Sequence, residues 1–592
     1  MHRGAAPAKR RLAWVAGITA GLALTLACQA LSPHRAGSSG GKGGGNPFPS
    51  QAQLDQLGPA PAASELARVE VDEVDSWTLQ GPFPDRVEDA PRKAGSPWEE
   101  VLDQAVARRA GLVLVTDAMQ CAARELGHFL LVRGKLPPTT LLAFMVARCG
   151  APAGETTHLY LEGAVPSTVD DAHLVEQWRP QLDQLLSRAL AGGPATAGLW
   201  FGRDGDRAVV TVVASPRHIL VAPFSPVETG DRLVFGGEVV GSPDAVTAWA
   251  NRGALGFTEC DRDPTVALPR FAFSCALDPG DPFALIDVAA RERGRILAEG
   301  VLRVLARRPG EDAQQWRRNR YAAARPASTP GDFTLGVSEV LGGVRKKANL
   351  PPLVLSKTQS EQVAELVPHV LAAPLGLGSS AVSDLAALGV LAGWRVGGSV
   401  KDAKMTSAAL AGPIDAGLWV DTALEEPTGR AALLDPEARV LAVGAVASEK
   451  PPVLVAIAAT YQLFGEEDLT AEAARYAKRV AEARAAREKS TPQPLVSVQG
   501  VAEHAVQTLA TSKLEPQLAL NDALAKAGSL VGRPVHGWYV QGRRVEDLPI
   551  PDELSNWDSL EMAVAVGSYQ PPDEPWGRLV VFIIALPPDV GI

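Results

Sequence analysis

Three pairs of apolar strands, spaced along a chain of 592 residues, constrain the fold more than any other feature. They lie near residues 197–213, 441–457 and 562–584. Each pair has an apolar strand with a glycine at or near its end, a polar turn and a β-branched strand. Each pair follows helical segments, so the pattern predicts an α+β protein with helix-then-hairpin units. Either one unit recurs three times, or these are the hairpins that any αβ protein offers.

Length and charge narrow the class of protein further. At roughly 150 residues per domain, the chain has room for three or four domains, and its 46% of hydrophobic residues can form their cores. The formal net charge of −10 argues against a nucleic-acid partner, because phosphate contacts need clustered lysine and arginine. We therefore predict a multidomain globular protein that binds no nucleic acid.

The N-terminus has the pattern of an export signal. A basic run at residues 9–11 precedes an apolar run at 12–27, which is shorter than the roughly 20 residues of a membrane-spanning helix and suits a signal peptide. Residues 25–28, Thr-Leu-Ala-Cys, resemble a bacterial lipobox. The resemblance implies a lipid anchor on Cys28, which makes the membrane a partner, and Gln29 implies sorting to the outer membrane. Plain secretion and an uncleaved anchor are the alternatives.

Four further cysteines suit an oxidising compartment. Cys121 and Cys149 lie in one helical region, and Cys260 and Cys275 lie in one strand-rich region. Four cysteines allow three pairings, and local pairing is the simplest because each bridge closes a short loop within one unit. Export allows such disulfides to form. Metal binding is the alternative, although no histidine stands at ligand spacing from any of these cysteines.

Two motifs occur in order between residues 331 and 465. The first has an arginine three intervening residues before Asn-Leu-Pro-Pro-Leu, and the second reads Pro-Thr-Gly-Arg-Ala-Ala-Leu-Leu-Asp-Pro. They resemble motifs of the CAP superfamily, the group of cysteine-rich secretory proteins, antigen 5 and pathogenesis-related proteins. The resemblance implies an α-β-α sandwich of about 130 residues. The positions concerned are Arg345, Pro351, Pro352, Gly429, Arg430 and Asp435.

The chain departs from that superfamily at its cleft, where two histidines and two acidic residues can hold a divalent metal. Gly429 stands where the family has one of these histidines, and His369 is the only histidine between residues 219 and 503. A lone histidine offers one ligand where a metal site needs three or four. We therefore expect no metal and no cofactor. We expect His369 to cap or to pack, with a residual cleft role as the alternative.

Changes in composition predict seven successive segments. They are a signal peptide (1–28), a flexible linker (29–95), a helical unit ending in a β-hairpin (96–215), a small β-sandwich (216–330), the degenerate CAP-like domain (331–465), a solvated connector helix (466–492) and a C-terminal α/β unit (493–592).

These features suggest three functions. The first is a non-catalytic binding or scaffolding protein of the bacterial envelope, because the metal-binding tetrad is missing and no acid–base or nucleophile constellation stands out. The second is a binder of lipids or other hydrophobic ligands, as some CAP proteins are, and the third is an envelope hydrolase with residues that do not align. Two close carboxylates with raised pKa in a cleft would favour the hydrolase. We expect a lipid or an envelope protein as partner.

Overall fold

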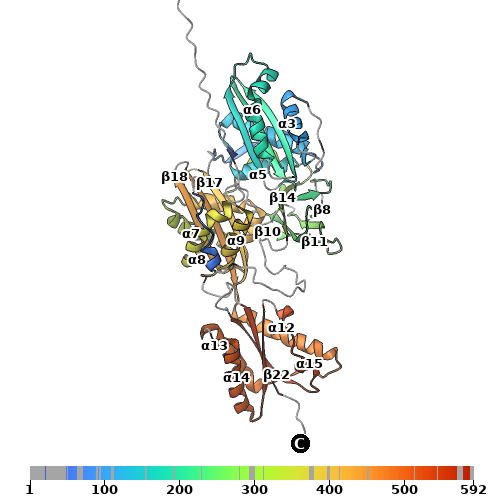
Figure 1. Ribbon diagram of the computed structural model, residues 1–592, viewed down its shortest axis with the longest axis vertical. Helices are drawn as coiled ribbons and strands as arrows, with labels where there is room; N and C mark the ends of the chain where they lie inside the picture. Colours follow the sequence, from blue (N-terminus) through green and yellow to red (C-terminus); the bar gives the residue numbers. More distant parts are fainter. Residues whose placement is uncertain are drawn as a thin grey trace, which may run out of the picture.

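The computed structural model assigns most of the chain to helices and strands (Figure 1). The residues that it describes are 20–21, 49, 51–62, 71–88, 91, 95–108, 112–153, 156–190, 194–227, 230–278, 280–292, 300–310, 313–372, 379–396, 400–411, 414–449, 452–512, 514–542, 545–569 and 578–586. Among these residues, no helix is both long enough and apolar enough to cross a membrane.

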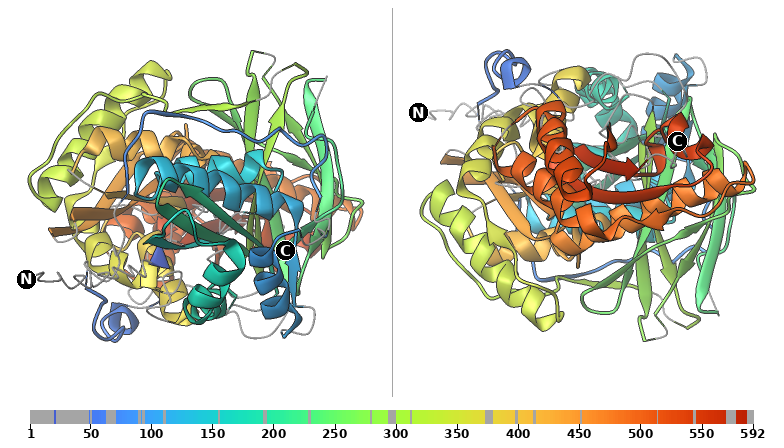
Figure 2. Two further views of the ribbon diagram at one scale, coloured as in Figure 1. Left: turned by 90° about the horizontal axis from the view of Figure 1, so that it is seen from above. Right: turned by 90° about the horizontal axis from the view of Figure 1, so that it is seen from below.

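Four bodies follow one another along the chain. We name them the first αβ unit (95–216), the β-sandwich (219–317), the second αβ unit (327–463) and the third αβ unit (465–586). In Figure 1 the three αβ units follow one another along the longest axis, and the β-sandwich, in green, lies beside the first two. Figure 2 shows that the β-sandwich and the olive helices of the second unit lie on opposite sides of the molecule.

The first αβ unit is a sheet between two layers of helices. Its sheet has the order β1-β4-β6-β5-β3, in which β3 runs parallel to β5 and the other neighbours are antiparallel. Its elements are α3 (Pro97–Ala107), β3 (Val113–Val115), α4 (Asp117–Arg133), α5 (Thr139–Arg148), β4 (Thr157–Ala164), α6 (Asp171–Ala189), β5 (Ala195–Asp204), β6 (Arg207–Pro216) and the two-residue β1 (Ala20–Gly21).

The second αβ unit repeats this arrangement. Its sheet has the order β16-β18-β19-β17, with β16 parallel to β18 and the other neighbours antiparallel. Its elements are α7 (Pro330–Lys347), β16 (Val354–Leu355), α8 (Lys357–Ala372), α9 (Ser380–Ala392), β17 (Val400–Ala411), α10 (Ala416–Leu424), α11 (Pro427–Leu433), β18 (Val440–Glu449) and β19 (Pro452–Leu463).

The third αβ unit has the same topology again. Its sheet has the order β20-β22-β23-β21, with β20 parallel to β22. Its elements are α12 (Glu466–Ala485), β20 (Gln493–Pro494), α13 (Val496–Ser512), α14 (Pro516–Val531), β21 (His536–Gly542), the 3₁₀ helix η2 (Val545–Asp547), α15 (Asp552–Asn556), β22 (Glu561–Tyr569) and β23 (Arg578–Leu586).

Each αβ unit has two cores, one on each face of its sheet. In β18, Val440 and Ala442 face the core beneath α8 and α9, whereas Leu441 and Val443 face the core beneath α7 and α10. Alternation along a strand distributes side chains in this way. The predicted α-β-α sandwich is therefore confirmed for the second unit. The suspected recurrence of one unit is seen as a shared three-layer topology in all three.

The region between the first two αβ units is a β-sandwich, as predicted. Two four-stranded sheets, β10-β9-β13-β14 and β11-β12-β8-β7, enclose one hydrophobic core. The strands are β7 (Ile219–Val221), β8 (Arg232–Val239), β9 (Pro243–Arg252), β10 (Gly256–Glu259), β11 (Asp261–Arg262), β12 (Arg270–Ala276), β13 (Phe283–Glu292) and β14 (Gly300–Arg307), followed by β15 (Gln315–Arg317).

The predicted flexible linker 29–95 is wrong for residues 71–88. Strand β2 (Ser76–Thr78) pairs with β15, and Leu79 and Val87 are each 1% exposed in the cores of the first unit and the β-sandwich. Helix α1 (Gln51–Leu54) packs Leu54 against the second unit. These segments are ordered because their apolar side chains meet cores that form much later in the chain.

The predicted solvated connector helix is also wrong. Helix α12 buries Tyr476 and Val480 in a core with β22 and β23, so it is the first helix of the third unit. The Tyr476 hydroxyl donates to the carbonyl oxygen of Pro549 over 2.9 Å. The apolar stripe of this helix is narrow because few side chains suffice to cover a sheet face that α15 and η2 also cover.

Candidate functional site

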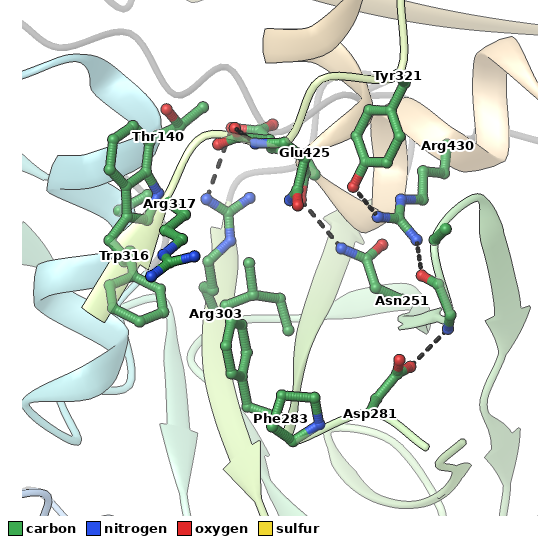
Figure 3. A pocket seen from close by; sticks show the side chains of 18 of the residues that line it. Thr140, Asn251, Asp281, Phe283, Arg303, Trp316, Arg317, Tyr321, Glu425 and Arg430 are labelled. Carbon is green, nitrogen blue, oxygen red and sulfur yellow. Dashed lines mark hydrogen bonds and ion pairs between the residues drawn. The ribbon is translucent and has the colours of Figure 1, made fainter. Parts of the chain in front are cut away.

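Four segments that lie far apart in the sequence line a partly open cavity of about 340 Å³ (Figure 3). They are α5 of the first αβ unit, strand ends and turns of the β-sandwich, residues 315–321, and the corner between α10 and α11 of the second unit. We call this space the central cavity. Because three bodies form its walls, its shape depends on how the whole chain folds.

The corner between α10 and α11 supplies three polar side chains to the cavity. Helix α10 ends at Leu424, and Pro427 opens α11 at a position where a missing backbone N–H does no harm. Glu425 and Glu426 therefore stand side by side between the two helices, and Arg430 follows on the first turn of α11. All three side chains are buried.

Two carboxylates, Asp421 on α10 and Glu425 just beyond its end, hold a segment that lines the cavity. The Asp421 carboxylate accepts the backbone N–H groups of Tyr321 and Ala322 over 2.8 and 2.9 Å. One turn later, Glu425 Oε1 accepts the N–H of Asn319 over 3.2 Å. These bonds fix the chain that carries Tyr321 against the second unit, although the partners are about 100 residues apart in sequence.

Arg430 joins the second unit to the β-sandwich. Its guanidinium donates to the carbonyl oxygens of Leu424, Gly253 and Gly256 over 2.8, 3.0 and 2.8 Å, and to the Tyr321 hydroxyl over 2.8 Å. In the described part of the chain, no carboxylate oxygen lies within 4 Å of it. Arg430 is 3% exposed, so this cation is buried on neutral acceptors alone, and burial lowers its pKa.

A second arginine in the cavity wall is paired with carboxylates. Arg303 on β14 makes two bonds to Asp287 on β13, Nε to Oδ1 over 2.7 Å and Nη2 to Oδ2 over 3.0 Å. Its Nη1 lies 3.5 Å from Glu426 Oε1. Burial opposes the charge of Arg303, but the two carboxylates keep its pKa above the ordinary value. This network ties the β-sandwich to the α10–α11 corner.

The two glutamates at the corner hold protons unusually tightly. Burial raises the pKa of Glu425 to about 7, against the opposing effects of Thr140, Arg318 and the Asn319 N–H. Burial also raises the pKa of Glu426, and Arg303 opposes this shift. A carboxyl group with a pKa near 7 can both give and take a proton at neutral pH.

The cavity also has unmet hydrogen-bonding capacity and aromatic walls. Asn251 Nδ2 donates to the carbonyl oxygen of Glu425 over 3.0 Å, whereas its buried Oδ1 has no partner within the described residues. Rings of Phe144 and Phe283, with centroids 5.5 Å apart, line the cavity together with Trp316. Such a mixture of apolar surface and a few placed polar groups is typical of sites for small molecules.

The first sequence motif forms a structural lock away from the cavity. Arg345, fully buried at the end of α7, donates from Nε to the carbonyl oxygen of Pro351, and from its terminal nitrogens to those of Leu433 and Asp435. Pro352 is exposed beside this lock. The arginine therefore joins the two motifs through backbone carbonyls.

The remaining motif residues also serve the fold. The Asp435 carboxylate accepts from Lys404 Nζ over 2.6 Å, and this ammonium lowers its pKa although burial acts against it. A Cβ on Gly429 would lie 1.8 Å from the carbonyl oxygen of Ala423, so no side chain fits there. His369 is buried in the last turn of α8, where burial lowers its pKa.

The structure tests the predictions for four of the five cysteines. Cys121 pairs with Cys149, and Cys260 pairs with Cys275, which confirms both local disulfides and fits an exported protein. Cys28 lies outside the described residues, as does most of the apolar run before it. Within those residues, no group of three or more His, Cys, Asp and Glu side chains is arranged to hold a metal ion.

Of the predicted site residues, only Arg430 lines the central cavity. Asn251, Tyr321 and the Glu425–Glu426 pair also line the cavity, and the sequence does not predict them as site residues. One signal was available for Arg303 and Asp287: each is a charge within an apolar run of its strand, and the two charges are opposite. No local signal marks Asn251, because it becomes a cavity residue only through contacts far along the chain.

Comparisons with known proteins give little. No family model matches the chain, and no curated protein matches it. Among solved structures, an extracellular protein containing an SCP domain from Bacillus anthracis has 11% identity and a TM-score of 0.17, covering 41% of this chain and 67% of that one. A cysteine-rich secretory protein from Staphylococcus aureus has the same identity and TM-score, covering 41% of this chain and 84% of that one.

Proposed function

We propose that this chain is an exported, lipid-anchored binding protein of the bacterial envelope, whose ligand occupies the central cavity. The observation that carries the proposal is the cavity itself. Three bodies contribute to its walls, and polar side chains are already fixed there by hydrogen bonds. Its volume of about 340 Å³ falls in the range of roughly 300–1,000 Å³ for small-molecule sites.

The N-terminal sequence and the disulfides support the proposed export and lipid anchoring. The export pattern and the lipobox-like residues that end at Cys28 support anchoring, and the two disulfides support an oxidising compartment. The resemblance of the second unit's motifs to the CAP superfamily points the same way. Apart from Arg430, which lines the cavity, the motif residues that the structure describes serve the fold, which supports binding rather than catalysis.

The test is native mass spectrometry of the full chain, purified in detergent from producing cells. Ala143 lies on α5 in the cavity wall, so Ala143→Phe fills the cavity. Ala525→Phe, on the exposed face of α14, is the matched control. We expect an extra mass on the wild type and on the control that Ala143→Phe loses. A wild type without bound mass, or a mass that Ala143→Phe keeps, would contradict the proposal.

One observation favours a second function, an envelope hydrolase. Glu425 has a pKa of about 7, that of Glu426 is also raised, and both side chains line one cavity. Such a pair can provide general acid–base catalysis. Incubation with isolated envelope fractions would release products detectable by mass spectrometry. Products from the wild type but not from Glu425→Gln would establish the hydrolase. Products from neither protein would contradict the hydrolase and support binding as the function.

A further inference from the structure

The central cavity offers both kinds of hydrogen-bonding group to a ligand. Asn251 Oδ1 is a buried acceptor that lacks a donor among the described residues, and Figure 3 shows the Asn251 amide nitrogen turned toward Glu425. A guanidinium has five N–H groups, and within the described chain Arg430 uses four of them. Arg317 extends into the same space, and its only side-chain bond within the described residues is to Gln315 over 3.0 Å. A matching ligand must therefore both donate and accept.

The charges around the cavity balance. Three guanidinium groups face three carboxyl groups, namely Arg303, Arg317 and Arg430 against Asp281, Glu425 and Glu426. Asp287 pairs with Arg303, and the two glutamates, whose pKa values burial raises, are only partly ionised at neutral pH, so the wall has no strong field of either sign. A ligand with a large net charge would meet repulsion from half of these groups. The balance favours a neutral ligand.

The aromatic rings in the cavity wall indicate that the ligand also has an apolar face. Phe144, Phe283 and Trp316 present apolar surface beside the polar groups, and they come from α5, β13 and β15. An acyl chain would cover this surface but would leave the buried Asn251 Oδ1 and the remaining N–H of Arg430 without partners, which is unfavourable for buried polar groups. The ligand therefore combines an apolar face with several hydroxyl-like groups.

Resting on the proposed function, we propose that the central cavity binds a neutral saccharide unit. Each hydroxyl group of a sugar donates one hydrogen bond and accepts two, so neighbouring hydroxyls can satisfy Asn251 Oδ1 and the free N–H of Arg430 together. The C–H face of the ring packs against the aromatic wall. No bond is formed or broken in this proposal.

Isothermal titration calorimetry of the full chain tests it, with glucose, mannose and N-acetylglucosamine as probes and succinate and laurate as comparison ligands. We expect a saccharide to bind, and we expect Ala143→Phe to abolish this binding. Asn251→Ala removes the unmet acceptor and should weaken binding about tenfold. Asn521→Ala, on the exposed face of α14, is its matched control and should leave binding unchanged.

Arg317→Ala controls for loss of folding, because the Arg317 side chain is exposed and, among the residues that the structure describes, bonds only Gln315. It should weaken saccharide binding severalfold while the unfolding temperature stays that of the wild type. Saccharide binding that survives both Ala143→Phe and Asn251→Ala overturns the inference, and so does the absence of saccharide binding. If succinate or laurate binds instead and Ala143→Phe abolishes that binding, the proposed function stands and only the saccharide is wrong.

Discussion

Two buried arginines close equivalent turns in the second and third αβ units. Arg345 and Arg484 are each 0% exposed near the end of the first helix of their unit. Each donates from Nε to the carbonyl oxygen six residues later and from its terminal nitrogens to carbonyls before the third strand. Four residues after each arginine, Asn349 and Glu488 both have φ of +57°. The same local turn therefore occurs with almost no sequence in common.

This turn predicts a stability effect in the third unit. Arg484→Met keeps the length of the side chain but leaves the buried carbonyl oxygens of Leu554 and Trp557 without a donor. We expect a loss of about 2–4 kcal/mol, seen as faster hydrogen exchange in peptides from β22. Arg487→Ala, three residues on and exposed, is the control and should change exchange little. Equal exchange in both variants would refute a locking role for Arg484.

The buried glutamate predicts a pH dependence. Glu425 has a pKa of about 7 in the folded chain, against an ordinary value of 4.5. Between these values the folded state keeps a proton that the unfolded state has lost, so stability falls as pH rises, by up to about 3 kcal/mol. Glu425→Gln should therefore raise the unfolding temperature at pH 8 more than at pH 5. Glu361→Gln, exposed on α8, should not, and parallel curves for Glu425→Gln and wild type would contradict this prediction.

Residue roles could be predicted only where a motif is local. Arg345 and Arg430 were identified because their motifs lie within short runs of sequence. Glu425 was not, because its environment depends on Asn319 and Asn251, which lie 106 and 174 residues away. The burial of Glu425 depends on segments that meet only in the folded chain, so no periodic pattern in the sequence predicts it.

At the scale of elements, each unit brings a helix close to the third strand of its sheet. Glycines make this approach short: a Cβ on Gly444 in β18 would lie 2.2 Å from the backbone nitrogen of Ala364 in α8. A Cβ on Gly198 in β5 would lie 2.2 Å from the Met119 carbonyl carbon in α4. Gly198, Gly444 and Gly567 of the predicted hairpins are therefore helix contacts.

This contact predicts the effect of adding a methyl group. Gly444→Ala forces the sheet and α8 apart and should reduce stability by about 1–3 kcal/mol. Gly500→Ala in α13 is the control, since nothing lies within 4 Å of a Cβ there, and it should raise stability by about 0.5 kcal/mol. Differential scanning calorimetry of the full chain measures both. An unchanged unfolding profile for Gly444→Ala would show that the helix can move away.

The elements that the sequence predicted well are those with local patterns. The hairpins have continuous apolar runs and turn residues such as Asp204-Gly205, and the structure contains them. The role of α12 and the order in residues 71–88 were missed, because their partners are strands such as β22 and β15, which lie far along the chain. The apolar stripe of a helix does not show which part of a distant sheet that helix will cover.

At the scale of the whole molecule, the cavity depends on how the bodies meet. The first unit contributes α5, the β-sandwich contributes strand ends and turns, and the second unit contributes the α10–α11 corner. The third unit lies at the far end of the long axis in Figure 1, away from the cavity. A ligand site formed this way would bind only when all three bodies are folded together.

Anchoring predicts where the full chain is found. Cys28→Ser removes the thiol that would be acylated, so we expect the protein to leave the membrane fraction, because two or more acyl chains are needed for stable anchoring. Gln29→Ala is the control and should stay with the membrane. Fractionation and intact-mass measurement follow both variants. A Cys28→Ser protein that remains with the membrane, at the same mass offset as the control, would contradict lipid anchoring.

A crystal structure of the full chain, purified from producing cells without removal of bound molecules, tests the central claim most directly. We expect ligand density inside the central cavity, within hydrogen-bond distance of Asn251 Oδ1 and Arg430 and against the ring of Trp316. A cavity that holds only water, or a ligand bound elsewhere on the chain, would contradict it.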